Sequence, residues 1–462
     1  MAAARRIVIV GGGIAGLAAA RSAVLRGRQL QRDIAVTVLE RAPRFGGVLV
    51  TERVDGFLLD AGADSWVVAK PHATALARAL GLGGELLGTQ LENRRYYVGW
   101  GDRLHLVPEG LVLGVPTRIG PLVTTSLFTW HGKARMALEP LVAARRFEGD
   151  DDESIADFAT RRLGREAAER LVAPLLGGIS AGDASDISVR AAFPQLVAME
   201  QEYGSLVRGM LVARRARSGD SPFMSLEGGT GALVDALVDR LHADGVTLRE
   251  RTAVDGIARN RDGTWTVSLE GGERLEADAV LLAVPAYAAG KLVGSLDDEL
   301  ARALTSIYYG SSTTVFLGYR RADVQHPLHG VGFVVPRTAG RAVMACTWVS
   351  SKWEGRAPEA HVLLRVFLGG SAKPDDEQVA TARAELRTLM GLDAEPCMTR
   401  VFHFEHSSAQ MRVGHLVTLR TIRARLAKAA PGLRIAGGGY DGVGIPDCIR
   451  QGEEAGRAMV DF

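Results

Sequence analysis

The sequence feature that most constrains the fold is a glycine-rich turn close to the N-terminus. The turn reads Gly11-Gly12-Gly13-Ile14-Ala15-Gly16 and fits the pattern G-x-G-x-x-G. Residues 6–10 before it read Arg-Ile-Val-Ile-Val, and this run of β-branched apolar residues is typical of a buried parallel strand, while residues 14–25 after it predict a helix. A second apolar strand over residues 34–39 leads into Glu40. These segments predict a βαβ unit that closes on an acidic residue.

Each residue type in this unit suits the binding of a dinucleotide. Gly11 permits the tight turn, Gly13 lets the backbone approach a pyrophosphate at the helix N-terminus, and Gly16 allows close packing of helix on strand. Glu40 is placed to accept hydrogen bonds from a ribose diol, and an acid here disfavours the 2′-phosphate of NADP. The alternative is a glycine-rich turn that only joins a strand to a helix.

Two further turns distinguish FAD from NAD. Gly46 and Gly47 form a second glycine pair shortly after the acid, and residues 59–66 contain a third tight turn around Gly62. A fold that binds NAD does not require these turns. A flavin must also be held along its ribityl chain and ring, so additional places of close backbone approach favour FAD.

Composition and charge exclude several other classes. The 462 residues suggest two or three folding units, and a net charge of +2 gives no reason to expect a nucleic-acid partner. Three cysteines, Cys346, Cys397 and Cys448, are too few for a disulfide framework or a standard zinc site. The histidines are not at ligand spacing either, so we expect no metal. A reducing, cytoplasmic location is therefore the default.

The N-terminus resembles a signal peptide only superficially. Basic residues precede an apolar run there, but the triple glycine at residues 11–13 argues against an export helix. No other uninterrupted apolar stretch is long enough for a membrane-spanning helix.

The chain changes character several times along its length. Residues 1–90, 216–290 and 426–462 alternate strands and helices and predict three pieces of one dinucleotide-binding domain. Residues 91–215 are arginine-rich and helical, which predicts an inserted domain, and residues 291–425 predict a mixed α+β domain for substrate. In the first piece, Gly27 is expected to end the first helix.

Five stretches of sequence together resemble one family of flavoproteins. The chain is similar to the flavin-dependent amine oxidase superfamily, and within it to the protoporphyrinogen oxidases of haem synthesis and their coproporphyrinogen-oxidising relatives. The resemblance covers essentially the whole chain, and it rests on residues 11–16; 46–48 with 62–65; 93–99 with 106–108; 178–183 with Ser188, Phe193 and Pro194; and 438–449.

The resemblance implies an α/β fold. Its parts are a Rossmann-like FAD domain of the glutathione-reductase type, a mixed α+β substrate domain and an inserted, mostly helical domain. One FAD is expected per chain, without a covalent bond. The residues implied to contact it are Gly11, Gly12, Gly13, Ile14, Ala15, Gly16, Glu40, Arg41, Gly47, Val48, Gly62, Ala63, Asp64, Ser65, Val254, Gly438, Val443, Gly444 and Ile445.

The implied reaction removes hydrogens from the methylene bridges of a porphyrinogen, with O₂ as the acceptor and H₂O₂ as a product. The flavin performs the chemistry, so no catalytic side chain is expected. Arg94 matches the arginine that binds a substrate propionate in the family. If the match is shifted by one residue, Arg95 takes this role. The structural alternative is that both arginines are exposed to solvent and bind no substrate. Gly178 and Ile179 match a stretch over the substrate, and Phe367 matches an apolar residue beside the flavin. The structural alternative for Gly178 is a glycine that ends a helix, and for Phe367 it is an ordinary residue of the core.

Several alternatives stay open at this point. Protoporphyrinogen IX is the first expectation for the substrate and coproporphyrinogen III the second. An amine oxidase, a carotenoid desaturase and a non-catalytic escort protein of the same fold are further readings. Residues 409–415 lack the proline and tyrosine that are usual in the family, so a looser turn is expected there.

The resemblance also bears on partners. It is compatible with a homodimer and with peripheral contact at the inner face of the cell membrane. Residues 208–217, or the segment around Trp130, Lys133 and Arg135, would supply that contact. Solvated surfaces are the alternative reading of both segments.

Overall fold

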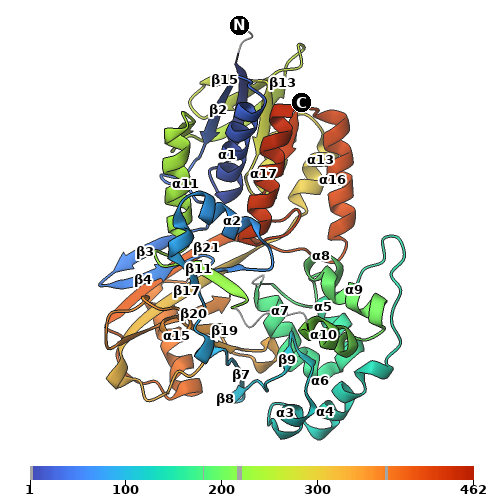
Figure 1. Cartoon of the computed structure of the whole chain (residues 1–462), viewed down its shortest axis with the longest axis vertical. Coiled ribbons are helices and arrows are strands. Elements are labelled where there is room, and N and C mark those ends of the chain that lie inside the picture. The colour runs from blue at the N-terminus through green and yellow to red at the C-terminus, as the bar shows by residue number, and fades with distance from the viewer. Residues whose placement is uncertain (1–3, 180–181, 216–220, 370–372, 462) are drawn as a thin grey trace.

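The computed structural model describes residues 4–179, 182–215, 221–369 and 373–461. Its elements form three parts, and Figure 1 shows one of them at the top and the other two side by side below.

The upper part is built on a parallel sheet of five short strands. The strand order is β12 (Thr247–Arg249), β2 (Ile34–Leu39), β1 (Arg5–Val10), β16 (Ala279–Leu282) and β22 (Leu433–Ile435). Successive side chains of β1 point to opposite faces of the sheet, so Ile7 and Ile9 join one core and Val8 and Val10 join another. The sheet is therefore covered on both sides, as all-parallel sheets are.

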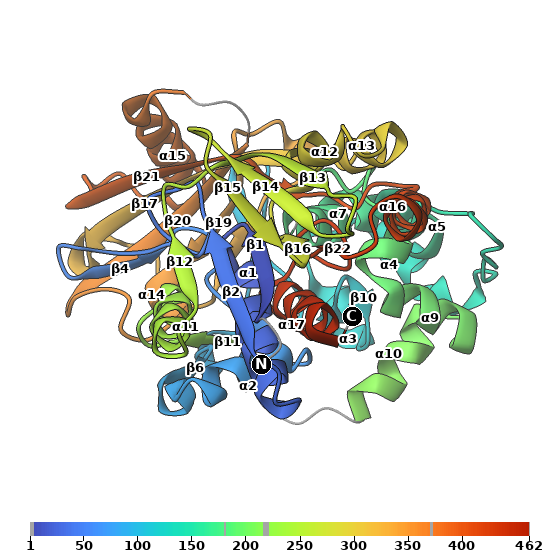
Figure 2. The same cartoon turned by 90° about the horizontal axis from the view of Figure 1, so that it is seen from above.

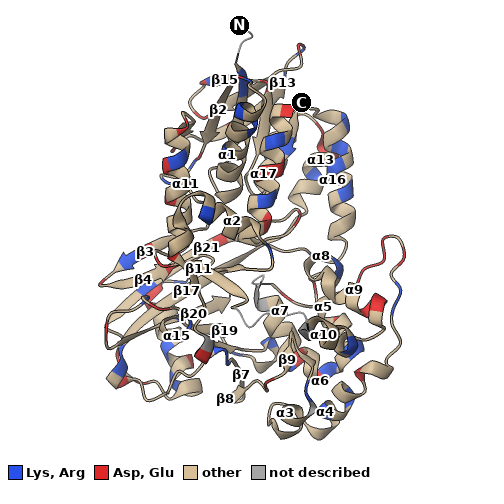
Figure 3. Ribbon diagram, in the orientation of Figure 1, with Lys and Arg blue, Asp and Glu red and all other residues tan. Residues whose placement is uncertain are grey.

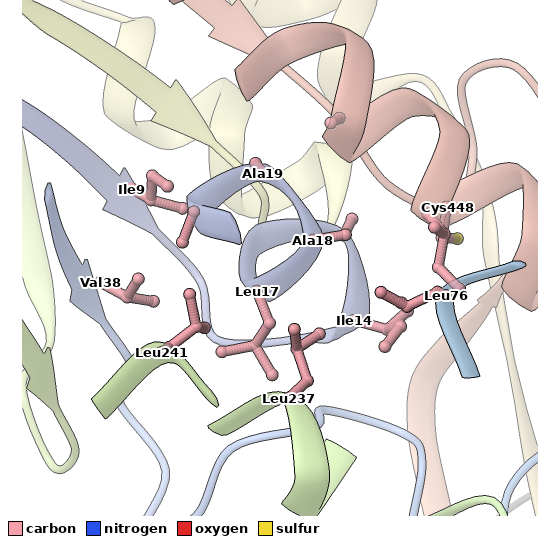
Figure 4. Packing of buried hydrophobic residues seen from close by; sticks show 14 of the residues in the cluster. Ile9, Ile14, Leu17, Ala18, Ala19, Val38, Leu76, Leu237, Leu241 and Cys448 are labelled. Carbon is pink, nitrogen blue, oxygen red and sulfur yellow. The ribbon is translucent and has the colours of Figure 1, made fainter. Parts of the chain in front are cut away.

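Three helices pack on the first face of this sheet: α1 (Ile14–Gln29), α11 (Gly231–Ala243) and α17 (Ile445–Asp461). Figure 4 shows Leu17 of α1 packed between Leu237 and Leu241 of α11, with Cys448 of α17 on the other side. The second face carries an antiparallel sheet of β13 (Val254–Arg259), β14 (Trp265–Leu269) and β15 (Arg274–Ala277), together with α12 (Ala286–Val293), α13 (Asp298–Thr305) and α16 (His415–Ala429). Figure 2 shows these two layers from above.

Helices α1 and α17 run parallel at very close range. A Cβ at Gly452 would clash with the carbonyl oxygen of Ala15, and one at Gly456 would clash with that of Ala19. Small residues at these points let the two backbones touch. The N-termini of both helices consequently lie together at the carboxyl edge of the parallel sheet, where ligands of open α/β sheets bind.

The first helix is longer than its sequence indicated. Gly27 was expected to end it, but α1 continues to Gln29. A Cβ at Gly27 would press into the side chain of Ile34, so this glycine serves close packing of the helix on β2 and does not terminate the helix.

The lower left part in Figure 1 is a mixed sheet of seven strands. Its order is β21 (Met398–Ala409), β17 (Tyr309–Arg320), β20 (His361–Gly369), β19 (Val343–Trp348), β18 (Gly332–Val334), β7 (Tyr97–Trp100) and β8 (Arg103–Leu106). Helix α15 (Asp375–Met390) covers one face. Residues 97–106 thus lie in the sheet, although the sequence grouped them with the helical segment.

The lower right part consists of helices between residues 119 and 215. They are α3 (Ile119–Thr124), α4 (Trp130–Ala137), α5 (Ile155–Leu163), α6 (Arg165–Ala167), α7 (Ala173–Ile179), α8 (Val189–Ala192), α9 (Pro194–Tyr203) and α10 (Leu206–Arg215), with a π-turn over Ala168–Val172 and a 3₁₀ turn, η3, over Glu139–Leu141. A buried ion pair between Arg162 and Glu139 lies at its centre.

The remaining elements are short. They are the hairpin of β3 (Thr51–Val54) and β4 (Phe57–Asp60); the sheet of β5 (Trp66–Val67), β11 (Phe223–Leu226) and β6 (Leu86–Gly88); the pair of β9 (Leu111–Val112) and β10 (Val115–Pro116); helices α2 (His72–Ala79) and α14 (Val349–Lys352); and the 3₁₀ turns η1 (Leu82–Glu85), η2 (Leu91–Asn93), η5 (Arg321–Asp323) and η6 (Arg337–Ala339).

Candidate functional site

The glycine turn between β1 and α1 contains one glycine that the protein itself does not require. Gly11 has φ of 108°, and a Cβ there would lie 2.5 Å from the carbonyl oxygen of Ala283. A Cβ at Gly16 would clash with the carbonyl oxygen of Gly11. A Cβ at Gly13, by contrast, would meet no protein atom within 4 Å. Gly13 therefore opens onto free space, which is the space that a pyrophosphate would fill.

The N-terminus of α1 is left open for an anion. Gly13 is its N-cap residue, none of the described side chains caps the helix, and its first turn contains no acidic residue. The first backbone N–H groups, including those of Ile14 and Ala15, have no partner within the helix and carry its positive dipole end. Free N–H groups beside an open glycine fit the phosphates of FAD.

Glu40 lies directly beside the turn. One oxygen of its carboxylate accepts a hydrogen bond of 2.8 Å from the N–H of Gly12, and the other accepts one of 2.8 Å from the N–H of Ala42. A carboxylate has about four acceptor positions, so roughly two remain for a ribose diol. Arg41, the next residue, is exposed.

The backbone of Glu40 also anchors the segment that leads to Val254. Its N–H donates to the carbonyl of Arg249 at 2.8 Å, and its carbonyl accepts from the N–H of Thr252 at 2.8 Å. Val254 begins β13 two residues later. The fold thus brings Val254 to the acid that is expected to bind the ribose, more than 200 residues away along the chain.

The second and third turns lie against the first. The N–H of Gly46 donates to the carbonyl of Gly12 at 2.8 Å, and a Cβ at Gly47 would be 3.4 Å from the Cα of Gly13. A Cβ at Gly62 would clash with the carbonyl oxygen of Val48, whose own side chain is largely exposed. Residues 46–48 and 62–65 therefore form one wall beside Gly13.

The carboxylate of Asp64 has partners within the protein. It points to Lys352 at 2.7 Å and to the indole N–H of Trp353 at 2.9 Å. The positive charge of Lys352 helps to hold the pKa of Asp64 below its usual range, although burial alone would raise that pKa. The Ala63 and Asp64 carbonyls accept from Thr230 and Ser225 at 2.8 and 2.7 Å. Asp64 therefore helps to fix the shape of the turn, and its contact with the flavin stays a prediction.

The C-terminal glycine segment completes the other side of this site. A Cβ at Gly438 would meet nothing within 4 Å, and its carbonyl accepts from the hydroxyl of Tyr309 at 2.8 Å. Val443 and Gly444 lead directly into α17, which begins at Ile445. Gly438 and Gly13 are thus two open glycines near two adjacent helix N-termini, and this arrangement fits a dinucleotide laid across the edge of the sheet.

Phe367 lies in the middle of the seven-stranded sheet, half-buried. Its neighbours across the strands are Thr314 of β17 and Ala345 of β19, and Ala345 in turn pairs with Val334 of β18. Phe367, Ala345 and Val334 are all half-buried. They form an apolar row on the sheet face that also carries Arg365, whose guanidinium lies 4.4 Å from the Phe367 ring.

The helical part reaches over this row of the sheet. Helix α7 contacts β18 and β19, and it ends with Gly178 and Ile179. The side chains of these two residues lie outside the part of the structure that is described, as do residues 180 and 181. The backbone contacts therefore place α7 against β19, which neighbours the strand of Phe367, and against β18 beyond it.

Arg94 is exposed and lies between η2 and β7. The segment before it is attached to α14, because the side-chain amide of Asn93 donates to Ser351 at 2.9 Å and Gln90 donates to the carbonyl of Lys352 at 3.1 Å. The Arg95 carbonyl accepts from Val331 at 2.8 Å. Arg94 is thus held close to the Asp64–Lys352 pair and several strands away from Phe367.

The segment around residues 409–415 is well anchored, contrary to the expectation of a looser turn. Gln410 donates to the Tyr308 carbonyl at 2.9 Å, Val413 donates to the Asp186 carbonyl at 2.8 Å, and the Met411 carbonyl accepts from Ser188 at 2.8 Å. Two of these backbone hydrogen bonds join the segment to the helical part, and together the three supply the order that a proline would otherwise provide.

Sequence reasoning missed Lys352, Trp353 and Arg365, which surround the third turn. They lie far from that turn in the sequence and match no local pattern, so no signal in the sequence alone identifies them. Within the described residues, no cluster of three or more His, Cys, Asp or Glu side chains is arranged to hold a metal ion. No described helix is both long enough and apolar enough to cross a membrane.

Comparisons with known proteins agree with this geometry. A family model described as flavin containing amine oxidoreductase matches residues 14–460. The chain is 34% identical over 464 residues to the coproporphyrinogen III oxidase of Bacillus subtilis, covering 98% of this chain and 97% of that protein. It is 32% identical to the protoporphyrinogen oxidase of Bos taurus, with 98% and 97% covered.

Solved structures show the same relationships. A crystal structure provisionally named protoporphyrinogen oxidase, from Exiguobacterium, superposes with a TM-score of 0.87 at 32% identity and covers 99% of both chains. Cyclohexylamine oxidase of Brevibacterium oxydans superposes with a TM-score of 0.72 at 17% identity, again over 99% of both chains. The second likeness shows a shared fold only.

Proposed function

Because this chain belongs to the family of flavin-containing amine oxidoreductases, we propose that it oxidises a porphyrinogen to a porphyrin with O₂ as the final acceptor. The enzyme is an FAD-dependent oxidoreductase. The main support for the proposed substrate is sequence identity. This chain is 31–34% identical, over nearly its full length, to enzymes named for porphyrinogens. Amine oxidases share the fold at only 17% identity.

Two porphyrinogens compete as the substrate. Protoporphyrinogen IX is the first expectation from the sequence, and a vertebrate relative named for it supports that choice. Coproporphyrinogen III is favoured by bacterial relatives from Bacillus, Staphylococcus and Propionibacterium, which all carry that name. The two compounds differ by vinyl or propionate groups at two positions, so the number of cations at the site distinguishes them.

The residues of this chain position the reactants and shape their surroundings. Bound FAD supplies the hydride acceptor for the methylene bridges, in a six-electron oxidation whose electrons pass to O₂ and give H₂O₂. Phe367, Ala345 and Val334 give an apolar surface on which a tetrapyrrole can lie, and α7, which contacts β18 and β19, would help to keep water away from it. The N-terminus of α17 offers a positive dipole end to negative charge.

Anaerobic titration of the holoenzyme with each porphyrinogen tests this proposal directly. We expect protoporphyrinogen IX or coproporphyrinogen III to bleach the flavin absorbance rapidly, whereas cyclohexylamine and putrescine leave it unchanged. The faster of the two porphyrinogens identifies the physiological substrate. Bleaching by an amine alone, or by none of the four compounds, would overturn the proposal.

We propose that the flavin is held without a covalent bond. The nearest cysteine in the C-terminal motif is Cys448, which is buried against Leu76 and other core residues (Figure 4). Burial raises the pKa of its thiol to about 12, so very little thiolate forms to attack a flavin. Acid precipitation of the holoenzyme should release all of its yellow colour into the supernatant, and a yellow pellet would contradict the assignment.

Arg94 is proposed to bind a propionate of the substrate. Its guanidinium suits a carboxylate bidentately, and its segment is held beside Asp64 and Lys352. Arg94→Ala should weaken substrate binding by roughly 1.5–3 kcal/mol, the range for a hydrogen bond to a charged group. The effect should appear in KM, because the propionate is remote from the reacting bridge.

Arg94→Lys should recover only part of the loss, since an ammonium lacks the planar fork. Arg95→Ala is the matched control and should leave KM unchanged. A rise in KM for Arg95→Ala alone would move the assignment by one residue. No change in either variant would leave Arg94 as a solvated side chain.

We also propose peripheral contact with the inner face of the cell membrane from a cytoplasmic location. Of the cations named from the sequence, Lys133 is buried and donates to the Val123 carbonyl at 2.6 Å, and Arg135 donates to the Arg161 carbonyl at 2.6 Å. In the other segment Arg208 is exposed, and residues 216 and 217 lie outside the described residues. Apolar side chains at the tip of the helical part are exposed, where α3 carries no charge (Figure 3): Val123, Trp130, Leu138 and Leu141.

These apolar side chains should insert into the interface of a bilayer. The protein should sediment with anionic phospholipid vesicles, and a Trp130→Ser/Leu141→Ser variant should lose most of this binding. Leu30→Ser, on the opposite part of the molecule, is the control. Equal sedimentation of all three proteins would refute the proposed surface. A homodimer stays a prediction, which sedimentation velocity checks.

A further inference from the structure

Five charged side chains lie around the third turn, whose residues 62–65 are expected to line the flavin. Two are carboxylates, Asp60 and Asp64, and three are cations, Lys352, Arg356 and Arg365. Lys352 and Arg365 come from the sheet part of the molecule, whereas the turn belongs to the FAD-binding part. The cluster therefore lies at the junction of the two parts.

Both carboxylates already have a cation of their own. The Lys352 ammonium lies 2.7 Å from Asp64, and the Arg356 guanidinium lies 3.4 Å from Asp60. Three cations against two carboxylates leave one positive charge in excess, and protonation of Asp60 would only enlarge that excess. The cation without a carboxylate is Arg365.

The groups that contact Arg365 directly are neutral, and Asp64 and Asp60 act on it only from beyond ion-pairing distance. Its guanidinium donates to the carbonyl of Ala61 and lies 4.4 Å from the ring of Phe367 and 5.4 Å from that of Phe316. Among the residues that the structure describes, no carboxylate lies within ion-pairing distance of it, and its Nε has no hydrogen-bond partner. Only 6% of the residue is exposed.

Such an arrangement is costly for the folded protein. A buried charge that lacks a counter-charge is destabilising, and proteins usually pair it or neutralise it. Burial lowers the pKa of Arg365 to about 10, even though Asp64 and Asp60 act in the opposite direction. A pKa of about 10 still leaves the guanidinium protonated near neutral pH, so the positive charge stays in the site.

We propose that Arg365 provides the counter-charge for the negative charge that the flavin acquires on reduction. Transfer of a hydride brings two electrons and one proton to a neutral ring, which leaves that ring with one negative charge. Arg365 bonds to Ala61, next to the expected flavin-lining residues 62–65, and it packs against Phe367, which is expected beside the flavin. A fixed positive charge in a site that excludes water strongly stabilises the negative charge of the reduced ring.

This role makes Arg365 a positioning residue that sets the reduction potential of the flavin. It rests on FAD as the cofactor and does not depend on which porphyrinogen is the substrate. A purely structural role predicts something different, because the loss of a structural arginine lowers stability without changing the potential. A role in binding a substrate carboxylate predicts a third result, a change in KM alone.

The test compares variants of the holoenzyme by the midpoint potential of the flavin. Arg365→Gln removes the charge and keeps a donor for Ala61, and Arg365→Met removes both charge and polarity, which is the safer change for folding. We expect the equilibrium to shift about tenfold toward oxidised flavin in both, which for a two-electron couple is a fall of about 30 mV. Arg365→Lys keeps the charge and should restore most of the potential.

Arg162→Lys is the matched control, since Arg162 is also a buried arginine but belongs to the helical part. It should lower thermal stability and leave the potential unchanged. An unchanged potential in a neutral Arg365 variant that binds FAD would overturn the proposal, and so would a rise in KM without a change in potential. Equal potentials for Arg365→Lys and Arg365→Met would likewise refute a role for the charge. If neither porphyrinogen reduces the wild-type flavin, the proposed substrate is refuted. The comparison of flavin midpoint potentials would still test the role of Arg365.

Discussion

Gly13→Val should give a protein that folds and purifies without flavin. A Cβ at this position meets no protein atom within 4 Å, so we expect the protein itself to accommodate a side chain here. It would instead occupy the space where a pyrophosphate approaches the N-terminus of α1. We expect the affinity for FAD to fall by at least two orders of magnitude, about 2.7 kcal/mol. The ratio of flavin to protein absorbance, measured beside circular dichroism, checks this result.

Gly16→Val is the informative partner of this variant. A Cβ at Gly16 would clash with the carbonyl oxygen of Gly11, so this change should disturb the fold as well as the binding of flavin. The pair therefore separates a glycine required by the cofactor from one required by the packing of helix on strand. A full complement of flavin in folded Gly13→Val would contradict the assignment of this turn to the pyrophosphate.

The second large effect concerns stability of the helical part. Arg162 is fully buried and forms ion pairs with the buried carboxylates of Glu139 and Glu200. Glu139 also accepts from the Ser205 hydroxyl at 2.5 Å and from the N–H of Leu206 at 2.9 Å, so it holds the start of α10. Arg162→Met would leave Glu139 buried without its ion-pair partner, whereas Glu200 would keep Arg161. We expect a loss of about 3–5 kcal/mol in the free energy of unfolding.

Chemical denaturation followed by circular dichroism measures this loss. The control is Arg165→Met, which removes an arginine from the same region whose side chain is 83% exposed. That change should scarcely move the denaturation midpoint. If both variants unfold at the same denaturant concentration as the wild type, the buried network does not stabilise the helical part.

The local features of the site could be predicted from the sequence. The glycine turn, the strand before it, the helix after it and Glu40 all lie within 36 consecutive residues, and their spacing alone indicates a βαβ unit. Backbone geometry makes this prediction possible, because only glycine suits the φ of 108° at Gly11 and the close approach of the backbone at Gly16. The same local reasoning was wrong for Gly27, whose role depends on the neighbouring strand and not on the helix that contains it.

The tertiary structure decided what surrounds the flavin-lining turn. Lys352 reaches Asp64 across 288 positions of the sequence, and Arg365 reaches Ala61 across 304. Likewise, β7 and β8 join a sheet whose other strands come after residue 308. A sequence determines the turns and periodicities that neighbouring residues impose on the backbone. Which distant charges share a buried site depends on how whole layers pack, and a charge without a counter-charge becomes visible only when all its neighbours are known.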